Sequence, residues 1–132
     1  LRAGASETSN SDGTIEDDSE FTGAIRYAVG SVTVGYQQSE IKSGTAGAAG
    51  ESVKAYGVAF NVNDSLSVSY AERELEIDDG DATNGTEDNS GVMVSYTMGG
   101  ASVRIAHNEH DSKGGVTGSN SENTEVSLVL AF

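Results

Sequence analysis

The chain of 132 residues contains no cysteine and no proline. Without cysteine it can form no disulfide, no thiol nucleophile and no cysteine-ligated metal site. Basic residues are also scarce, with 7 Lys and Arg against 21 Asp and Glu and a formal net charge of −14. This excess argues against nucleic acid or an anionic membrane surface as a partner. The longest apolar run, residues 128–132, is far shorter than the ~20 residues that a transmembrane helix needs.

The first residues of the chain are polar and acidic. The sequence begins at Leu1 rather than Met, so we expect a processed product or a part of a longer chain. Residues 1–20 hold six acidic residues against Arg2 alone and contain almost nothing to bury. We therefore predict that residues 1–20 are an acidic outer loop or a disordered start.

From Phe21 onward, apolar residues recur at every second position, which is the period of β-strands. Ile25, Tyr27 and Val29 alternate in this way with Arg26 and Ala28. The pattern predicts an all-β chain of seven strands, at residues 21–30, 32–37, 53–62, 66–71, 92–98, 102–106 and 124–132.

The links between these strands alternate between short and long. Gly30-Ser31, Asn63-Asp64 and Gly99-Gly100 are signals for tight hairpins, because Gly and Asn tolerate positive φ. Residues 38–52, 72–90 and 108–123 are long, polar and rich in glycine, and we predict them to be loops. All short turns then lie at one end of the sheet, as they do in a transmembrane barrel.

The two faces of the predicted strands differ in composition. Opposite the apolar face lie mostly Gly, Ala, Ser and Thr with an occasional Arg, which suits a water-filled lumen or tight inner packing better than a solvated sandwich face. All eight aromatic residues lie on the apolar face. Four of them, near the short turns, form one predicted aromatic belt: Tyr27, Phe60, Tyr96 and Phe132. The other four lie nearer the long loops: Phe21, Tyr36, Tyr56 and Tyr70.

The distance between two of these aromatic residues is too short for some of the rings to lie in belts at the two membrane interfaces. Tyr56 and Phe60 are four residues apart, about 13 Å along a strand and about 10 Å in height at a tilt of ~40°, less than an apolar band of ~25 Å. Contact with a neighbouring subunit is therefore an alternative for some rings. The core of a soluble sandwich is another.

Three segments carry a resemblance to a known family: YAVGSVTVGY at 27–36, VSYTMGGASV at 94–103 and EVSLVLAF at 125–132. Residues 21–132 resemble the C-terminal part of a Gram-negative general diffusion porin of the alphaproteobacterial type. The resemblance implies an antiparallel transmembrane β-barrel, with residues 21–132 as about seven C-terminal strands of a 16-stranded barrel domain. An open seven-stranded sheet is not tolerated in lipid, so the alternative is a smaller barrel in which the N-terminal segment is an eighth strand.

The same resemblance implies a function, a location and partners. It implies a homotrimer in the bacterial outer membrane that lets small hydrophilic solutes and ions diffuse passively, without a cofactor. The partners would be outer-membrane lipid and lipopolysaccharide, together with the barrel-assembly machinery, which would read the last strand and its terminal aromatic residue. The alternatives are a small outer-membrane barrel without a channel and a soluble adhesin-like β-sandwich.

A porin needs a polar lumen with an electrostatic bias rather than a catalyst. The alternation of the strands puts Arg26, Arg73 and Arg104 on the lumen side. Porins of this family have a basic cluster on the barrel wall, which makes these arginines pore-lining candidates; ordinary lumen solubility is the alternative. Ser, His and Asp are present without a nucleophile-elbow motif, so we expect no enzyme.

Metal sites find little support in the sequence, so we name no metal ligands. Residues 72–90 hold eight carboxylates against Arg73 alone, a composition that would suit Ca²⁺. However, Asp79, Asp81 and Thr83 are followed by Asn84, where a calcium loop needs glycine, and we expect solvated loop charge instead. His107 and His110 should lie on opposite faces of a strand, with no third ligand in view.

Overall fold

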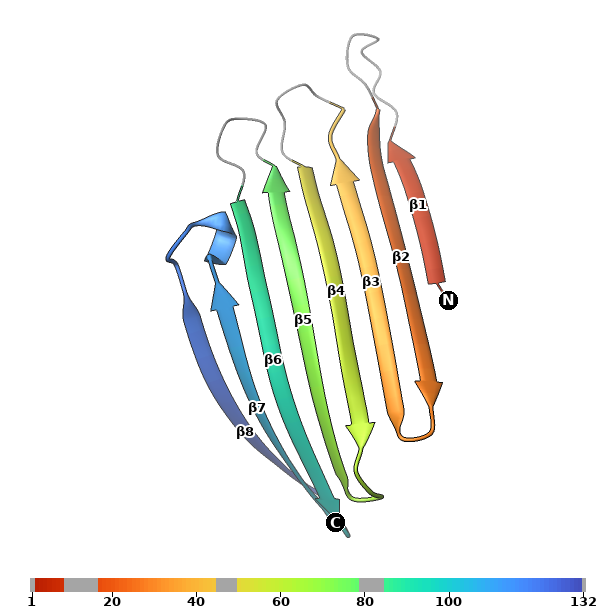
Figure 1. Cartoon of the computed structure of the whole chain (residues 1–132), viewed down its shortest axis with the longest axis vertical. Coiled ribbons are helices and arrows are strands. Elements are labelled where there is room, and N and C mark those ends of the chain that lie inside the picture. Colours follow the sequence, from red (N-terminus) through yellow and green to blue (C-terminus); the bar gives the residue numbers. More distant parts are fainter. Residues whose placement is uncertain (1, 9–16, 45–49, 79–84, 132) are drawn as a thin grey trace.

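The computed structural model describes residues 2–8, 17–44, 50–78 and 85–131. These residues form one antiparallel sheet in which every strand pairs with its neighbours in the chain (Figure 1). The elements are β1 (Arg2–Thr8), β2 (Asp18–Val29), β3 (Val32–Lys42), β4 (Gly50–Asn61), β5 (Leu66–Asp78), β6 (Gly85–Met98), β7 (Ala101–Asp111), the 3₁₀ turn η1 (Lys113–Gly115) and β8 (Ser121–Leu130). Within this part of the chain, no helix is long and apolar enough to cross a membrane.

The all-β antiparallel fold is confirmed, and the seven predicted strands correspond to β2–β8. Within residues 1–20, predicted to be a loop or a disordered start, residues 2–8 instead form strand β1, which pairs with β2 from Arg2↔Ala24 to Thr8↔Asp18. Residues 9–16 lie outside the described residues. Strand β1 is held by backbone hydrogen bonds. Its small residues, such as Ala3, Gly4 and Ala5, carry no apolar alternation by which a strand could be recognised.

The prediction of long loops is wrong over much of their length. β3 continues to Lys42, β5 to Asp78 and β7 to Asp111, while β6 begins at Gly85. On β5 the alternation continues with the two faces exchanged: Leu75 and Ile77 lie on the face opposite Val68 and Tyr70. A pattern that follows one apolar face therefore ends at Tyr70, although the backbone pairing does not.

Short turns join the strands at the lower end in Figure 1. Gly30 and Gly99 adopt φ of 55° and 59°, the left-handed conformation that the two-residue turns require. The turn predicted at Asn63-Asp64 is a longer connection between Asn61 and Leu66. There the Asn63 side-chain oxygen accepts hydrogen bonds from the backbone N–H groups of Ser65 and Leu66 at 2.8 and 2.9 Å.

The sheet is a single layer without a core of its own. No side chain in the described ranges is buried, and large apolar residues such as Val29 and Val126 are 61% and 67% exposed. The described strands leave β1 and β8 as two open edges. Whatever covers the apolar face therefore comes from outside these strands.

Candidate functional site

The register of the strands divides the side chains between two faces, because directly paired residues project to the same side. One face carries Tyr27, Tyr36, Tyr56 and Tyr70, and we call it the aromatic face. The other carries Arg26 with the glycines and alanines paired to it, and we call it the small-residue face. On each face, the polarity of the side chains changes along the strands.

The short turns step regularly along the sheet. The first short turn ends at Val32 on β3. From Val32, the row of directly paired residues passes through Phe60 on β4 and Val68 on β5 and reaches β6 at Val94. The third turn closes at Met98↔Ala101, four residues further along β6. The two turns are four strand spacings apart. With ~3.3 Å per residue and ~4.8 Å between strands, a shift of one residue per strand places the line of turns at roughly 35° to the rows of paired residues.

The boundary between apolar and polar residues on the aromatic face has the same slope. It falls between Tyr36 and Gln38 on β3, but the row through Tyr36 and Tyr56 crosses β5 at Glu72, which is already polar. On β5 the last apolar residue is therefore Tyr70, one position lower on this face. The row through Tyr70 reaches β7 at His107, and the last apolar residue there is Ile105. The boundary thus runs parallel to the line of short turns.

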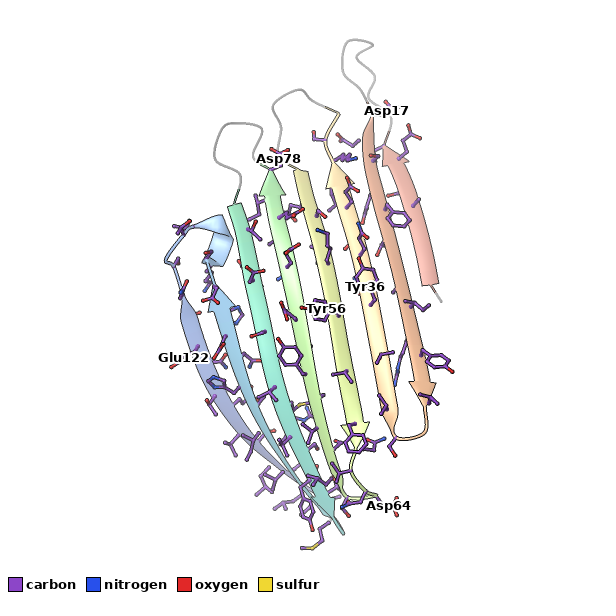
Figure 2. The ribbon with its side chains drawn as sticks, viewed as in Figure 1. Asp17, Tyr36, Tyr56, Asp64, Asp78 and Glu122 are labelled. Atoms are coloured by element: carbon purple, nitrogen blue, oxygen red, sulfur yellow. The ribbon has the colours of Figure 1, made fainter. Side chains whose placement is uncertain are left out.

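Tyrosines mark this boundary and direct their hydroxyl groups to its polar side. Tyr36 Oη donates to Gln38 Oε1 at 3.0 Å, and Tyr70 Oη donates to Glu72 Oε2 at 2.8 Å. Figure 2 shows Tyr36 and Tyr56 side by side on neighbouring strands, and they are direct cross-strand partners. Rings with one apolar and one polar end suit a border between an apolar and an aqueous layer.

Above the tyrosines, the aromatic face is acidic and polar. Lys54, which sequence parity alone would place among the apolar side chains, lies in this upper part and pairs with Glu74 at 3.1 Å and with Glu76 at 3.5 Å. Lys42 similarly pairs with Glu40 at 2.7 Å. All these groups are well exposed, so each ion pair contributes little to the free energy of unfolding.

The small-residue face has an open hollow of about 850 Å³. The row of residues that begins at Arg26 continues through Gly35, Gly57, Ala71 and Gly91, whose small side chains leave the space empty. A Cβ atom at Gly91 would lie 2.6 Å from Asn108 Oδ1, so a larger residue there would require the Asn108 side chain to move.

A polar network bounds the upper end of this hollow. Arg73 Nη1 lies 3.8 Å from Glu87 Oε1, which also accepts a hydrogen bond of 2.8 Å from Asn89 Nδ2. The Asn89 side-chain oxygen in turn bonds to His110 Nδ1. The Glu87 side chain is 13% exposed, the lowest value among the ion-paired carboxylates. A charged group so well covered needs these partners.

The turn η1 lies on the same network, although it connects β7 to β8. Gly114 N–H donates to Glu87 Oε2 at 2.7 Å, and η1 lies against β6 and β5. The hydrogen bond from Gly114, and next that from Asn89, lowers the pKa of Glu87 from its ordinary value of 4.5. Gly85 permits this contact, because a Cβ there would lie 2.5 Å from Gly115 Cα.

The predicted site residues lie at different places in this arrangement. Arg26 and Arg73 both line the hollow. Arg104 lies on the same face nearer the short turns, opposite Ser95 and Ser127. Within the described ranges, Arg73 is the only one of the three that forms an ion pair.

The predicted belt residues and the histidines can be placed in the same way. Tyr27, Phe60 and Tyr96 lie on the aromatic face, each within two residues of the end of its strand at a short turn, and Phe132 lies outside the described residues. His107 and His110 lie on opposite faces, as predicted: His107 is paired with Val92 and His110 with Asn89. Sequence reasoning missed Glu87 and Asn89, which alternate strictly on β6 but were assigned to a loop.

Comparison with known proteins identified no relative: the chain matches no protein family, no curated protein and no solved structure.

Proposed function

We propose that these strands are part of an outer-membrane β-barrel that acts as a passive diffusion channel for small hydrophilic solutes and ions. The observation that carries this proposal is the slope shared by the line of short turns and the apolar boundary. In a barrel whose strands tilt by ~35–45°, features at equal height in the membrane are displaced along successive strands in this way. The roughly 35° derived from the register agrees with that tilt.

The chemistry of the two faces supports the same proposal. In the barrel the aromatic face contacts lipid, with Tyr36, Tyr56 and Tyr70 at the outer interface. Phe60 lies only about 10 Å in height from Tyr56, less than an apolar band of ~25 Å, so the rings nearer the short turns contact lipid below this interface or a neighbouring subunit. The acidic upper part of that face extends beyond the hydrocarbon layer. Lipid then covers the apolar side chains that no part of the described chain covers.

The small-residue face is the lumen wall in this proposal. Arg26 and Arg73 line its hollow, and Arg104 lies below them towards the short turns. These arginines give the wall positive charge, which opposes the acidic upper ends of the strands. Solutes would meet acidic groups first and arginines further in.

The open edges of the sheet bear on how the barrel closes. Exposed strand edges are not tolerated in lipid, so β1 and β8 must pair with further strands or, in a smaller eight-stranded barrel, with each other. We propose the 16-stranded, trimeric arrangement of the porins that the sequence resembles. Outer-membrane lipid and lipopolysaccharide would then surround the trimer, and the barrel-assembly machinery would engage β8.

Conductance in a planar bilayer tests this function. We expect unboiled, detergent-extracted protein to give channel steps that arrive in threes. Arg26→Glu should shift the reversal potential towards cation selectivity. Lys42→Glu, which makes the same charge change on the aromatic face at the far end of β3, should shift it much less.

Two other results would contradict the proposal. Silence from protein that is folded and inserted would exclude a diffusion channel and favour a barrel without a channel. Protein that stays in solution and lacks heat-modifiable gel mobility would favour a soluble β-sandwich.

A further inference from the structure

Three potential metal ligands converge on the aromatic face, just above the apolar boundary. His107 and Glu109 alternate on β7, and Glu122 on β8 is the direct cross-strand partner of Glu109. Their ligand atoms all lie within 4.8 Å of one another. Figure 2 labels Glu122 on β8, the edge strand at the C-terminal side of the sheet.

The distances suit a small divalent ion. His107 Nε2 lies 3.5 Å from Glu109 Oε1. Two ligand atoms ~2.1 Å from a tetrahedral Zn²⁺ ion lie about 3.4 Å apart, so the spacing of this pair matches that of two zinc ligands. The three side chains are partly or fully exposed, which lets the carboxylates adjust and leaves a fourth position for water.

A hydrogen bond outside the cluster orients the imidazole for this role. His107 Nδ1 lies 2.8 Å from Thr124 Oγ1, its cross-strand partner on β8. With Nδ1 engaged, Nε2 is the nitrogen that faces the carboxylates. Bonds of this kind to the second ring nitrogen are typical of metal-ligating histidines.

The opposed carboxylates provide an independent reason for a cation. Glu109 and Glu122 face each other directly across β7 and β8, and like charges in that position destabilise a strand pair. Within the described ranges, neither carboxylate forms an ion pair with Lys or Arg. A bound cation would convert this repulsion into a link between the two strands.

We propose that His107, Glu109 and Glu122 form a binding site for a divalent transition-metal ion, best matched by Zn²⁺. Imidazole with carboxylates favours Zn²⁺ and related ions, whereas Ca²⁺ and Mg²⁺ prefer sites made only of oxygen ligands. The site joins edge strand β8 to β7. Sequence spacing alone paired His107 with His110 and so found no third ligand; the strand pairing brings Glu122 to His107 instead.

Isothermal titration calorimetry of the full folded chain with Zn²⁺ tests the site. We expect one ion per chain, at least tenfold weaker binding in His107→Ala and in Glu122→Gln, and no displacement by a hundredfold excess of Ca²⁺. Thr124→Val, which removes a positioning residue, should weaken binding about 10- to 100-fold without changing the stoichiometry. Circular dichroism would verify that each variant is folded.

Matched controls separate this site from adventitious binding. Glu125→Gln makes the same charge change as Glu122→Gln but on the opposite face of β8, and His110→Gln removes the other histidine. Both should bind Zn²⁺ as the unmodified chain does. Absence of Zn²⁺ binding, equal losses in Glu122→Gln and Glu125→Gln, or displacement by Ca²⁺ would overturn the proposal. None of these results depends on whether the barrel conducts.

Discussion

The lower and upper halves of the aromatic face belong to the same strands but have opposite chemistry. Below the tyrosines this face carries residues such as Val68, Val94 and Ile105, and above them it carries Glu72, Glu74 and their acidic neighbours. On the small-residue face, the upper half combines the apolar residues Leu75 and Ile77 of β5 with the polar network around Glu87. Strand continuity therefore depends on backbone pairing rather than on the polarity of either face.

The two halves are also stabilised in different ways. In the barrel that we propose, the lower half is stabilised by the transfer of its large apolar side chains out of water, at about 25 cal/mol per Å². The upper half relies on side-chain hydrogen bonds such as that from Gly114 to Glu87, because its ion pairs are well exposed and contribute little. Substitutions that are equivalent in chemistry should therefore have different effects in the two halves.

A charge placed in the lower half should have the largest effect. Val94→Arg on β6 should lower the free energy of unfolding in lipid vesicles by about 2–4 kcal/mol, the cost of an arginine near the bilayer midplane. Thr86→Arg, on the same strand and the same face but in the upper half, should change it by less than about 0.5 kcal/mol. Urea titration followed by circular dichroism measures both. Equal costs would show that lipid does not distinguish the two halves.

Removal of Glu87 should have the next largest effect, on the other face of the upper half. Glu87→Ala removes the acceptor of the bonds from Gly114 and Asn89 and the partner of Arg73. Because hydrogen bonds to charged groups contribute about 1.5–3 kcal/mol, we expect a loss of that order. Glu76→Ala removes an exposed carboxylate from β5 and should cost less than about 1 kcal/mol. The same titration compares them.

The pH dependence of stability should reveal the same carboxylate. The folded chain lowers the pKa of Glu87 below its ordinary value of 4.5, so at acidic pH the unfolded chain binds more protons at this group. Its contribution is therefore complete above pH 4.5 and is lost as the pH falls through the lowered pKa. The difference between the unmodified chain and Glu87→Ala should shrink in that range. A difference that stays constant from pH 7 to pH 3 would contradict this assignment.

The smallest effect is expected at the boundary itself. Tyr70→Phe removes the hydroxyl that donates to Glu72 and should lower the free energy of unfolding by about 0.5–1.5 kcal/mol. Tyr27→Phe is the matched control, since within the described ranges the Tyr27 hydroxyl forms no hydrogen bond to another side chain. If both changes cost the same, the Tyr70–Glu72 bond is not what holds the ring at the border.

Much of the fold was predictable from local pattern. The two-residue alternation of Ile25, Tyr27 and Val29 and of the later segments correctly placed β2–β8, and Gly30 and Gly99 correctly marked turns. The missed portions share one cause. In β1 and in the upper parts of β3 to β7, either apolar residues are absent or the apolar face is exchanged, so the signal disappears while the backbone hydrogen bonds continue.

The candidate sites were predictable only in part. The alternation placed Arg26 and Arg73 on one face, and the structure brings both to the hollow. Glu87 was counted as loop charge, although it alternates with Asn89, and that alternation was an available signal. No local sequence pattern predicts that His107 and Glu122 lie close together, because the two residues are on different strands.

The sequence alone indicates that the chain forms strands from Phe21 onward, which face of their lower parts is apolar, that Gly30 and Gly99 mark tight turns, and where the negative charge lies. These properties are local, since they depend on neighbouring side chains and on the backbone freedom of single residues. The tertiary structure decided the register, and with it the common slope of the turns and the apolar boundary, the network around Glu87 and the cluster at His107. Register depends on hydrogen bonds between distant segments, and a shift of one residue would move every side chain of a strand to the other face.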